Sequence, residues 1–366
     1  MKNKVTTVGK TVKKYFHSTV AKENEKHILD KLQGYDMVPE IYDASNRCIE
    51  MAYLPGMTLS ELIDRNENNL ETVFKSLIDW IKDFNSITGN IVLEDMNLKN
   101  FIFSNNKIYG IDFECWHRGD NKENYAAVLA AVQTAYFKDE DIKKYLYEYV
   151  ENLIDTDCSE AVQKQIEKIN LRRRAMKKIR NTDCVIISGG KSIRMGFPKG
   201  LLNYNGHTFI DHIIYNTAVF DRQYISANNN LYNDFNCKVI NDRYIDIGPM
   251  SAVHSGLTEC ENEYVFFIPC DMPFITEENI FYLFDTMDTT ADAVVFTAKD
   301  RTFPTVGIYR KSILPQLEKQ IESGNYKMMK LLESIKTQYV QALFPYQFEN
   351  INTPEDYKRI KQKDEV

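Results

Sequence analysis

The chain has 366 residues, more than one compact core usually spans, so two domains are expected. Hydrophobic residues make up 43% and charged residues 27%, as in an ordinary globular protein. The formal net charge of −7 argues against a general nucleic-acid binder, whose surface would carry a basic excess. It remains compatible with a nucleotide site, which needs only one local positive pocket.

Seven cysteines are scattered along the chain without a C-x-x-C pair. This pattern favours a reducing compartment over a disulfide framework or a zinc site. The N-terminal MKNKVTTVGKTVKKYF lacks the apolar stretch of a signal peptide, and no run approaches the roughly 18 apolar residues that cross a bilayer. We therefore expect a cytoplasmic protein with no membrane span.

The first third of the chain predicts strands, helices and a hairpin. Strands are expected at 11–16 and 47–54, on either side of a helix over 23–34. Apolar residues at helical spacing predict helices over 59–88, and helix returns over 121–180. The runs NFIFSNN and KIYGIDFE, joined by Asn105-Asn106, are typical of a hairpin.

The segment LEDMNLKNFIFSNNKIYGIDFE (93–114) contains polar residues at the spacing of a catalytic loop. Asp95 is followed five residues later by Asn100, then by the hairpin and by Asp112 in an apolar-Asp-Phe context. This is the spacing of a kinase catalytic loop and its metal-binding aspartate. The N-terminal half thus resembles a reduced, α+β protein-kinase-like domain of the aminoglycoside-phosphotransferase and lipopolysaccharide-kinase branch. The resemblance implies ATP as nucleotide, Asp95 as catalytic base, and Asn100 and Asp112 as magnesium ligands.

The same resemblance implies an ion pair and shows two departures. Glu25 in NEKHIL would pair with a strand lysine, either Lys13 or Lys14, and IEMAYLPGMTL (49–59) fits the hinge between lobes. Leu93 stands where the family has histidine, and only about ten residues precede the lysine strand, too few for two strands and a Gly-rich loop. A working small-molecule kinase, a kinase fold with little activity and a set of unrelated segments all remain open.

The basic stretch INLRRRAMKKIRNTD (169–183) is the best candidate boundary. It divides a kinase-like domain at 1–180 from a second domain at 181–366. A solvated helix face is the preferred interpretation of its charges, with an acidic partner or a membrane surface as the alternative.

After this boundary, strands and helices alternate. Strands are expected at CVIISGG, QYISAN, KVIND, YVFFIPCD and ADAVVFTA, with helices near 209–219, 250–260 and 277–286. Apolar runs without polar alternation suit strands that are buried on both faces of a parallel sheet. The order implies an α/β domain with a doubly wound, Rossmann-like, mostly parallel sheet that binds ligands at the C-terminal ends of its strands.

The loop IISGGKSIRMGFPKGLL (186–202) follows the first of these strands. Gly189 and Gly190 allow a tight turn that brings backbone N–H groups against phosphate oxygens. Arg194 and Lys199 add positive charge that matches a triphosphate. The loop is not a Walker A motif, because no Gly-Lys-Ser/Thr ends it.

Several landmarks carry a second resemblance. The loop is similar to the signature L-A-G-G-x-S-x-R-M-G-x-x-K of sugar-nucleotide and cofactor nucleotidyltransferases. DIGPMSAVHSGL (246–257), IPCDMPFI (268–275), PTVGIYRKSILPQLEKQIESGNYKMMKLL (304–332) and FENINTPEDY (348–357) follow in the order of the MobA family of molybdenum cofactor guanylyltransferases. The resemblance covers essentially all of 183–360 and implies the fold of the nucleotide-diphospho-sugar transferases.

Asp271 is the leading candidate for the chemistry. It follows the apolar strand VFFIPCD, where a carboxylate would emerge at the ligand-binding edge of the sheet. Magnesium prefers one or two carboxylates together with phosphate oxygens and water. A capping aspartate before Pro273 is the alternative on the residues alone, and the family match implies the metal role.

The resemblance also implies the other members of the site. Lys199 and Arg194 would act with Asp271 in catalysis. Asn228 would contact the base, in a register shared with two adjacent asparagines, and Asp242 would be the acidic residue that ends the third strand, with an ordinary loop role as its alternative. The remaining nucleotide contacts would be made by Ile187, Ser188, Gly189 and Gly190.

The implied reaction transfers GMP from GTP to the terminal phosphate of molybdopterin with Mg²⁺ and releases pyrophosphate. One rival is a kinase that phosphorylates a small alcohol, such as an aminoalcohol or a sugar, and feeds a cytidylyl- or guanylyltransferase. In another, the N-terminal half is a non-catalytic binding module. The sequence does not decide between GTP and another nucleoside triphosphate, or between molybdopterin and another phosphorylated acceptor.

Overall fold

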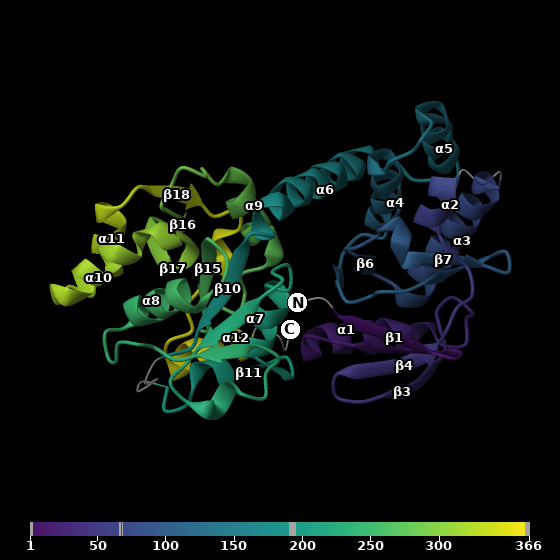
Figure 1. Ribbon diagram of the computed structural model, residues 1–366. Helices are drawn as coiled ribbons and strands as arrows, with labels where there is room; N and C mark the ends of the chain where they lie inside the picture. Colours follow the sequence, from purple (N-terminus) through teal and green to yellow (C-terminus); the bar gives the residue numbers. More distant parts are fainter. Residues whose placement is uncertain (1–2, 66, 68, 190–194, 363–366) are drawn as a thin grey trace. The chain divides into compact units, whose positions relative to one another are not determined.

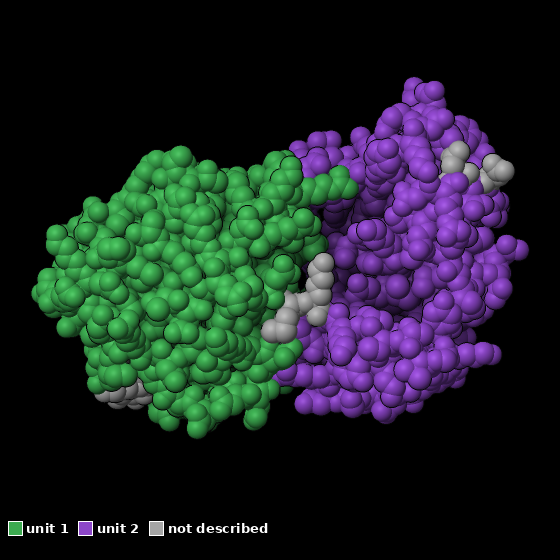
Figure 2. Space-filling model, viewed as in Figure 1, with its two compact units in different colours: residues 1–2, 171–366 green, residues 3–170 purple. Residues whose placement is uncertain are grey.

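The computed structural model describes residues 3–65, 67, 69–189 and 195–362. The chain forms two compact units, one of residues 3–170 and one that begins at Leu171 (Figures 1 and 2). The division falls inside helix α6 (Ser159–Ile179), ten residues before the boundary expected from the sequence. The end of α6 belongs with the second unit because Ala175 and Ile179 are buried in its core.

The N-terminal unit is an α+β region with small antiparallel sheets. Its largest sheet has the strand order β1-β2-β4-β3, and two smaller sheets are β5-β7-β8 and β6-β9. Its elements are β1 Lys4–Val8, β2 Thr11–Tyr15, α1 Thr19–Leu32, β3 Ile41–Ala44, β4 Cys48–Ala52, β5 Met57–Thr58, α2 Leu59–Arg65, α3 Leu70–Thr88, β6 Ile91–Leu93, η1 Leu98–Asn100, β7 Phe101–Ser104, β8 Lys107–Gly110, β9 Trp116–Arg118, α4 Lys122–Thr134, α5 Glu140–Asn152 and α6.

The expected hairpin is strands β7 and β8. Asn105 and Asn106 have φ of 49° and 61°, the left-handed values that a two-residue hairpin turn requires and that asparagine tolerates. A second short turn, at Gly9 and Lys10, joins β1 to β2. One strand and a tight turn therefore precede β2, in place of two strands and a glycine-rich loop.

The C-terminal unit is built on one mixed, mostly parallel sheet of seven strands in the order β14-β13-β10-β15-β17-β16-β18. β17 alone among the described strands of this sheet runs antiparallel to its neighbours. The elements are β10 Thr182–Ile187, η2 Lys199–Leu201, β11 Asn203–Tyr204, β12 His207–Thr208, α7 Phe209–Asn216, β13 Gln223–Ser226, η3 Asn230–Tyr232, β14 Lys238–Ile240, α8 Pro249–Glu259, β15 Tyr264–Pro269, α9 Glu277–Thr286, β16 Ala293–Ala298, β17 Arg301–Arg310, η4 Lys311–Ile313, α10 Leu314–Glu322, α11 Met328–Ser334, β18 Thr337–Gln341, η5 Pro345–Gln347 and α12 Pro354–Gln362.

Helices cover both faces of this sheet (Figure 1). Along β15, Phe266 and Ile268 enter the core that α7 and α9 complete, and Val265 and Phe267 enter the core under α8, α10 and α11. Successive side chains point to opposite faces, so a strand between two helical layers must be apolar throughout. This is why the run YVFFIP has no polar alternation.

The basic stretch is the end of α6 and the start of β10. Arg174 donates to both carboxylate oxygens of Asp285 on α9, at 2.7 and 2.9 Å. Part of the positive charge of the basic stretch is therefore paired within the C-terminal unit. Asp183 does not belong to a polar linker, because it lies in β10 and is fully buried. Its carboxylate accepts from Arg222, from Asn262 and from the backbone N–H groups of Glu261 and Asn262.

Within the described part of the chain, we find no helix that combines the length and apolar character needed to cross a membrane.

Candidate active sites

Asp271 lies where the sequence places it, just beyond the C-terminal end of β15. Its Oδ2 lies 2.9 Å from Nζ of Lys199, which begins η2. Both side chains are largely buried, with 15% and 16% of their surfaces exposed. Among the described residues, the carboxylate pairs with this ammonium and accepts from no backbone N–H, which argues against the capping role.

Asn352 completes this group and was not singled out from the sequence. Lys199 Nζ donates to Asn352 Oδ1 at 2.6 Å, across 153 positions of the chain. The backbone N–H of Ile351 donates to the carbonyl of Asp271 at 2.9 Å and joins the two segments. Asn352 belongs to the FENINTPEDY stretch, so the motif contained the residue but did not indicate its partner.

The second oxygen of Asp271 suits a cation. Oδ1 is buried and has no hydrogen-bond partner among the described residues. A buried carboxylate oxygen without a donor is costly unless a ligand satisfies it. A carboxylate just beyond a strand end is a donor type that magnesium accepts. The residues present therefore fit a magnesium ion at Asp271.

The glycine loop leaves β10 beside Asp242. Ile187 ends β10, and Ser188 donates its backbone N–H to the carbonyl of Ser226 at 2.9 Å. A Cβ on Gly189 would lie 2.9 Å from Oδ2 of Asp242, so only glycine fits there without a shift. Gly190 and Arg194 lie outside the described residues.

Asp242 follows β14 and is held by two side chains. Ser226 Oγ donates to its Oδ1 at 2.6 Å, and Asn228 Nδ2 donates to its Oδ2 at 3.2 Å. Asn229 instead caps η3 by accepting from the N–H of Leu231. The contacts thus single out Asn228 from the run of three asparagines. The role of Ser226 was missed, because nothing in QYIS distinguishes it from any buried strand serine.

These residues gather at one edge of the sheet. β14, β13, β10 and β15 are consecutive neighbours and run parallel, so their C-terminal ends lie side by side. Asp242, Ser226, Gly189 and Asp271 stand at or just beyond those four ends. An open α/β sheet binds its ligand at this edge.

In the N-terminal unit, the lysine that pairs with Glu25 is Lys14 and not Lys13. Lys14 Nζ lies 2.5 Å from Glu25 Oε2, whereas Lys13 Nζ lies 2.8 Å from Glu50 on the neighbouring strand β4. Adjacent residues of a strand point to opposite faces. Lys14 shares its face with buried Phe16, a pattern visible in VKKYF that would have selected it.

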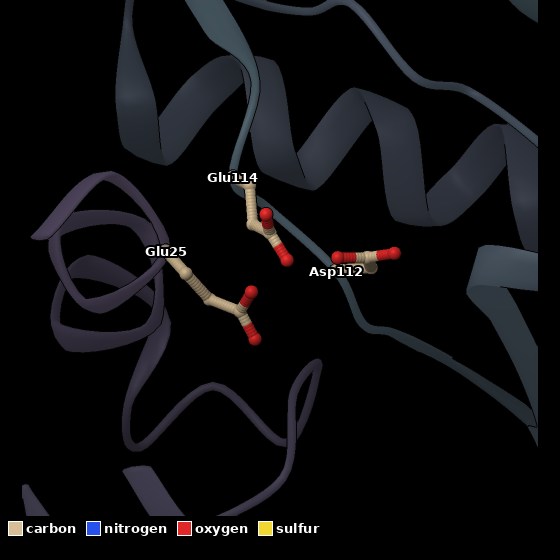
Figure 3. Close-up of side chains that lie close together, drawn as sticks. All are labelled: Glu25, Asp112 and Glu114. Atoms are coloured by element: carbon tan, nitrogen blue, oxygen red, sulfur yellow. The ribbon is translucent and has the colours of Figure 1, made fainter. Parts of the chain in front are cut away.

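Three carboxylates surround Lys14. Besides Glu25, its ammonium contacts Asp112 at 2.6 Å and Glu114 at 2.7 Å. Figure 3 shows the three acidic side chains directed into a common space, where one oxygen from each lies within 4.8 Å of the others. Glu114 belongs to the IDFE stretch and was not assigned a role from the sequence. The positive charge at the centre of these three carboxylates is the ammonium group of Lys14.

Burial and mutual repulsion set the charges of this cluster. Burial raises the pKa of Glu114 to about 8, since burial together with Asp112 and Glu25 outweighs the attraction of Lys14. Burial alone would also raise the pKa of Asp112, but Lys14 lowers it below its usual value. The same carboxylates raise the pKa of Lys14 despite its burial, so this lysine stays charged.

Asn100 and Asp112 are brought together by the hairpin. The N–H of Ile111 donates to the carbonyl of Asn100 at 2.9 Å, and Asn100 Nδ2 donates to the carbonyl of Asp95 at 3.0 Å. Asp112 has a φ of 67°, a left-handed conformation that is strained for a residue other than glycine. The positions expected for a kinase catalytic loop thus lie beside the Lys14 cluster within one unit.

The sheet and site of the C-terminal unit define a nucleotidyltransferase domain. Residues 184–341 match the model of the MobA-like NTP transferase domain. A probable molybdenum cofactor guanylyltransferase of Clostridium perfringens is 32% identical over 193 residues, covering 50% of this chain and 96% of that protein. The molybdenum cofactor guanylyltransferase of Vibrio parahaemolyticus is 34% identical over 187 residues, covering 50% and 95%.

The chain belongs, through its C-terminal half, to the family of MobA-like NTP transferases. Among solved structures, molybdopterin-guanine dinucleotide biosynthesis protein A of Archaeoglobus fulgidus is 22% identical, with a TM-score of 0.45 over 50% of this chain and 98% of that one. The family match begins at residue 184, so the N-terminal unit lies outside it.

Proposed function

We propose that the C-terminal unit transfers GMP from GTP to the terminal phosphate of molybdopterin. An oxygen of that phosphate attacks the α-phosphorus of GTP, the new P–O–P bond forms, and pyrophosphate leaves. The observation that carries the proposal is the Lys199–Asp271–Asn352 group at the end of β15, where Asp271 Oδ1 has no hydrogen-bond partner among the described residues. The family supports the class of reaction, and the names of the relatives suggest the base and the acceptor.

Each residue has a distinct task in this proposal. Lys199 binds phosphate oxygens, and Asp271 and Asn352 hold its ammonium in place. Asp271 Oδ1 would hold magnesium, which supplies charge neutralisation at the phosphates when bound. We expect the backbone N–H of Gly189 to bind the rest of the triphosphate, together with Gly190 and Arg194, which lie outside the described residues. A phosphate monoester is largely deprotonated at neutral pH, so alignment and charge suffice without a dedicated general base.

The decisive experiment measures pyrophosphate release with GTP, CTP or ATP, each with and without molybdopterin. We expect release only when GTP, magnesium and molybdopterin are all present. Release with CTP and a phosphorylated alcohol, but not with GTP and molybdopterin, would instead identify a cytidylyltransferase. No release with any nucleotide would reject the transferase assignment.

A second function is favoured by a specific observation in the N-terminal unit. We propose that this unit is a kinase-like domain that binds Mg–ATP, with Asn100 and Asp112 as metal ligands and Asp95 as the base. The contact of Lys14 with both Glu25 and Asp112 carries this proposal, since a kinase orients its phosphate-binding lysine through such a glutamate. Its acceptor would be a small alcohol, such as an aminoalcohol or a sugar.

The turn that joins β1 to β2 consists of Gly9 and Lys10 alone, too short to cover a row of phosphates, and this favours the weaker form of this proposal, a binding module with little phosphotransfer. Thermal shifts of the whole chain separate these cases. A magnesium-dependent shift with ATP, together with ATP consumption when an aminoalcohol or a sugar is supplied, supports a working kinase. A shift without consumption supports a binding module, and no shift rejects both.

A further inference from the structure

The backbone around Asn352 is held on both sides. Before it, the N–H of Ile351 donates to the carbonyl of Asp271. After it, Thr353 directly precedes helix α12, and Asp356 lies in the first turn of that helix. One carboxylate oxygen of Asp356, Oδ2, accepts from the N–H of Asn352 and from the N–H of Thr353, each at 3.0 Å. Asp356 thus fixes the path by which the chain leaves the active site and enters α12.

One of these two hydrogen bonds is not needed to cap the helix. In a capping box, the third residue of a helix accepts from the N–H of the N-cap residue, and the N-cap side chain accepts from the third residue in return. Asp356 and Thr353 make this exchange, since the N–H of Asp356 also donates to Thr353 Oγ1 at 3.2 Å. The bond from Asn352, one residue before the N-cap, is additional. It fixes the backbone of an active-site residue rather than the start of the helix.

Helix α12 also packs against the segment that carries Lys199. Ile360 of α12 shares a small hydrophobic cluster with Leu202, three residues after Lys199. Asp356 belongs to the same helix and holds Asn352, whose Oδ1 accepts from Lys199 Nζ at 2.6 Å. The helix therefore fixes Asn352 relative to the lysine that it contacts.

The carboxylate of Asp356 suits this task because it stays ionised. Burial would raise its pKa, but the hydrogen bonds from Asn352 and Thr353 and the charge of Arg359 lower it below its usual value. Its Oδ1 accepts from Arg359 Nη2 at 3.3 Å, so Oδ2 remains directed at the two N–H groups. An ionised acceptor binds an N–H group more strongly than a neutral one.

We propose that Asp356 is a positioning residue of the transferase site, which acts through Asn352 to hold the ammonium of Lys199 where the triphosphate binds. This inference rests on the proposed transferase function and assigns no catalytic step to Asp356. Removing the carboxylate frees the backbone of Asn352, so the ammonium has to be ordered when the phosphates bind. The result is weaker binding of the triphosphate by a chain that still folds.

The test uses the whole chain and equilibrium binding of Mg–GTP without an acceptor. Asp356→Ala should raise the Kd by roughly threefold to tenfold, the effect of one lost hydrogen bond. Thr353→Ala is the matched control, because it removes the other half of the same capping box and leaves the bond from Asn352 in place. Both variants should lower the Tm by about 2–4 °C, but the control should keep the wild-type Kd. Asp356→Asn retains an accepting oxygen and should bind within about twofold of the wild type.

A double-mutant cycle shows whether Asp356 acts through Asn352. In an Asn352→Ala background, Asp356→Ala should cause no further change in the Kd, because the side chain that it positions is gone. The fall in Tm that comes from helix capping should persist in both backgrounds. The cycle therefore separates positioning from a purely structural role.

The outcomes also separate this inference from the proposal beneath it. If the wild type does not bind Mg–GTP, the transferase function fails and the inference fails with it. If the wild type binds and Asp356→Ala changes the Kd no more than Thr353→Ala, Asp356 is only a helix cap and the inference is overturned. An effect of Asp356→Ala that is undiminished in the Asn352→Ala background also overturns it. Should Asp356→Ala be unfolded at the assay temperature, Asp356→Ser replaces it with the same expected result, since its side chain is too short to reach both N–H groups.

Discussion

Replacing Asp271 with asparagine keeps the size and shape of the side chain and removes its charge. The position lies just beyond β15, outside the hydrophobic cores of the unit. Two interactions depend on the charge: the 2.9 Å contact with Lys199 and the capacity of the free Oδ1 to hold a cation. The substitution therefore tests the site rather than the fold.

The expected magnitudes differ for rate and stability. Removing one well-placed electrostatic group from such a site costs about 10²–10³ in rate, or roughly 3–4 kcal/mol. The free energy of unfolding should change by less than about 1 kcal/mol, because the asparagine oxygen still accepts from Lys199 and an unpaired carboxylate oxygen is removed.

The assay is pyrophosphate release at saturating GTP and molybdopterin over a magnesium titration. Asp285→Asn is the matched control, since Asp285 is similarly shielded at 19% exposure and is also ion-paired, but lies on α9. We expect the control to keep wild-type turnover. Turnover of Asp271→Asn within a few-fold of wild type, with normal magnesium dependence, would mean that the active site has been placed wrongly.

Four further results are expected. Lys199→Ala should raise the KM for GTP more than it lowers kcat, and an unchanged KM would argue against a phosphate contact. Asp112→Asn should abolish the magnesium-dependent thermal shift with ATP and leave GTP-dependent transfer intact; a shift that persists would exclude Asp112 as a metal ligand. Asp183→Ala should lower the free energy of unfolding by about 3–5 kcal/mol in denaturant titrations, since it removes a fully buried carboxylate that accepts four hydrogen bonds. A fragment that begins at residue 180 should fold and keep transferase activity. Its free energy of unfolding should be about 2–3 kcal/mol lower than that of a fragment that begins at residue 171, because the longer fragment retains the buried Ile179. Equal stability of the two fragments would contradict the boundary inside α6.

The elements of the C-terminal unit follow from local sequence because its strands are apolar on both faces. Runs such as YVFFIP cannot remain exposed, so their burial between helical layers is settled before any partner is known. The position of Asp271 can be predicted from the same run, because the first charged residue after a buried apolar strand must lie at the edge of the sheet. The hairpin at Asn105 and Asn106 is equally local, since it depends on the left-handed conformation that asparagine accepts.

The partners of the site residues do not follow from local sequence, because each is fixed by contacts between distant segments. Asn352 reaches Lys199 across 153 positions only because Ile351 is tied to Asp271. Lys14 rather than Lys13 meets Glu25 because of the face on which β2 packs, and Glu114 joins them because the chain after β8 returns to the same place. A sequence records which polar groups are available. The packed chain decides which of them meet, because a side chain must be both on the right face and in the right register to reach its partner.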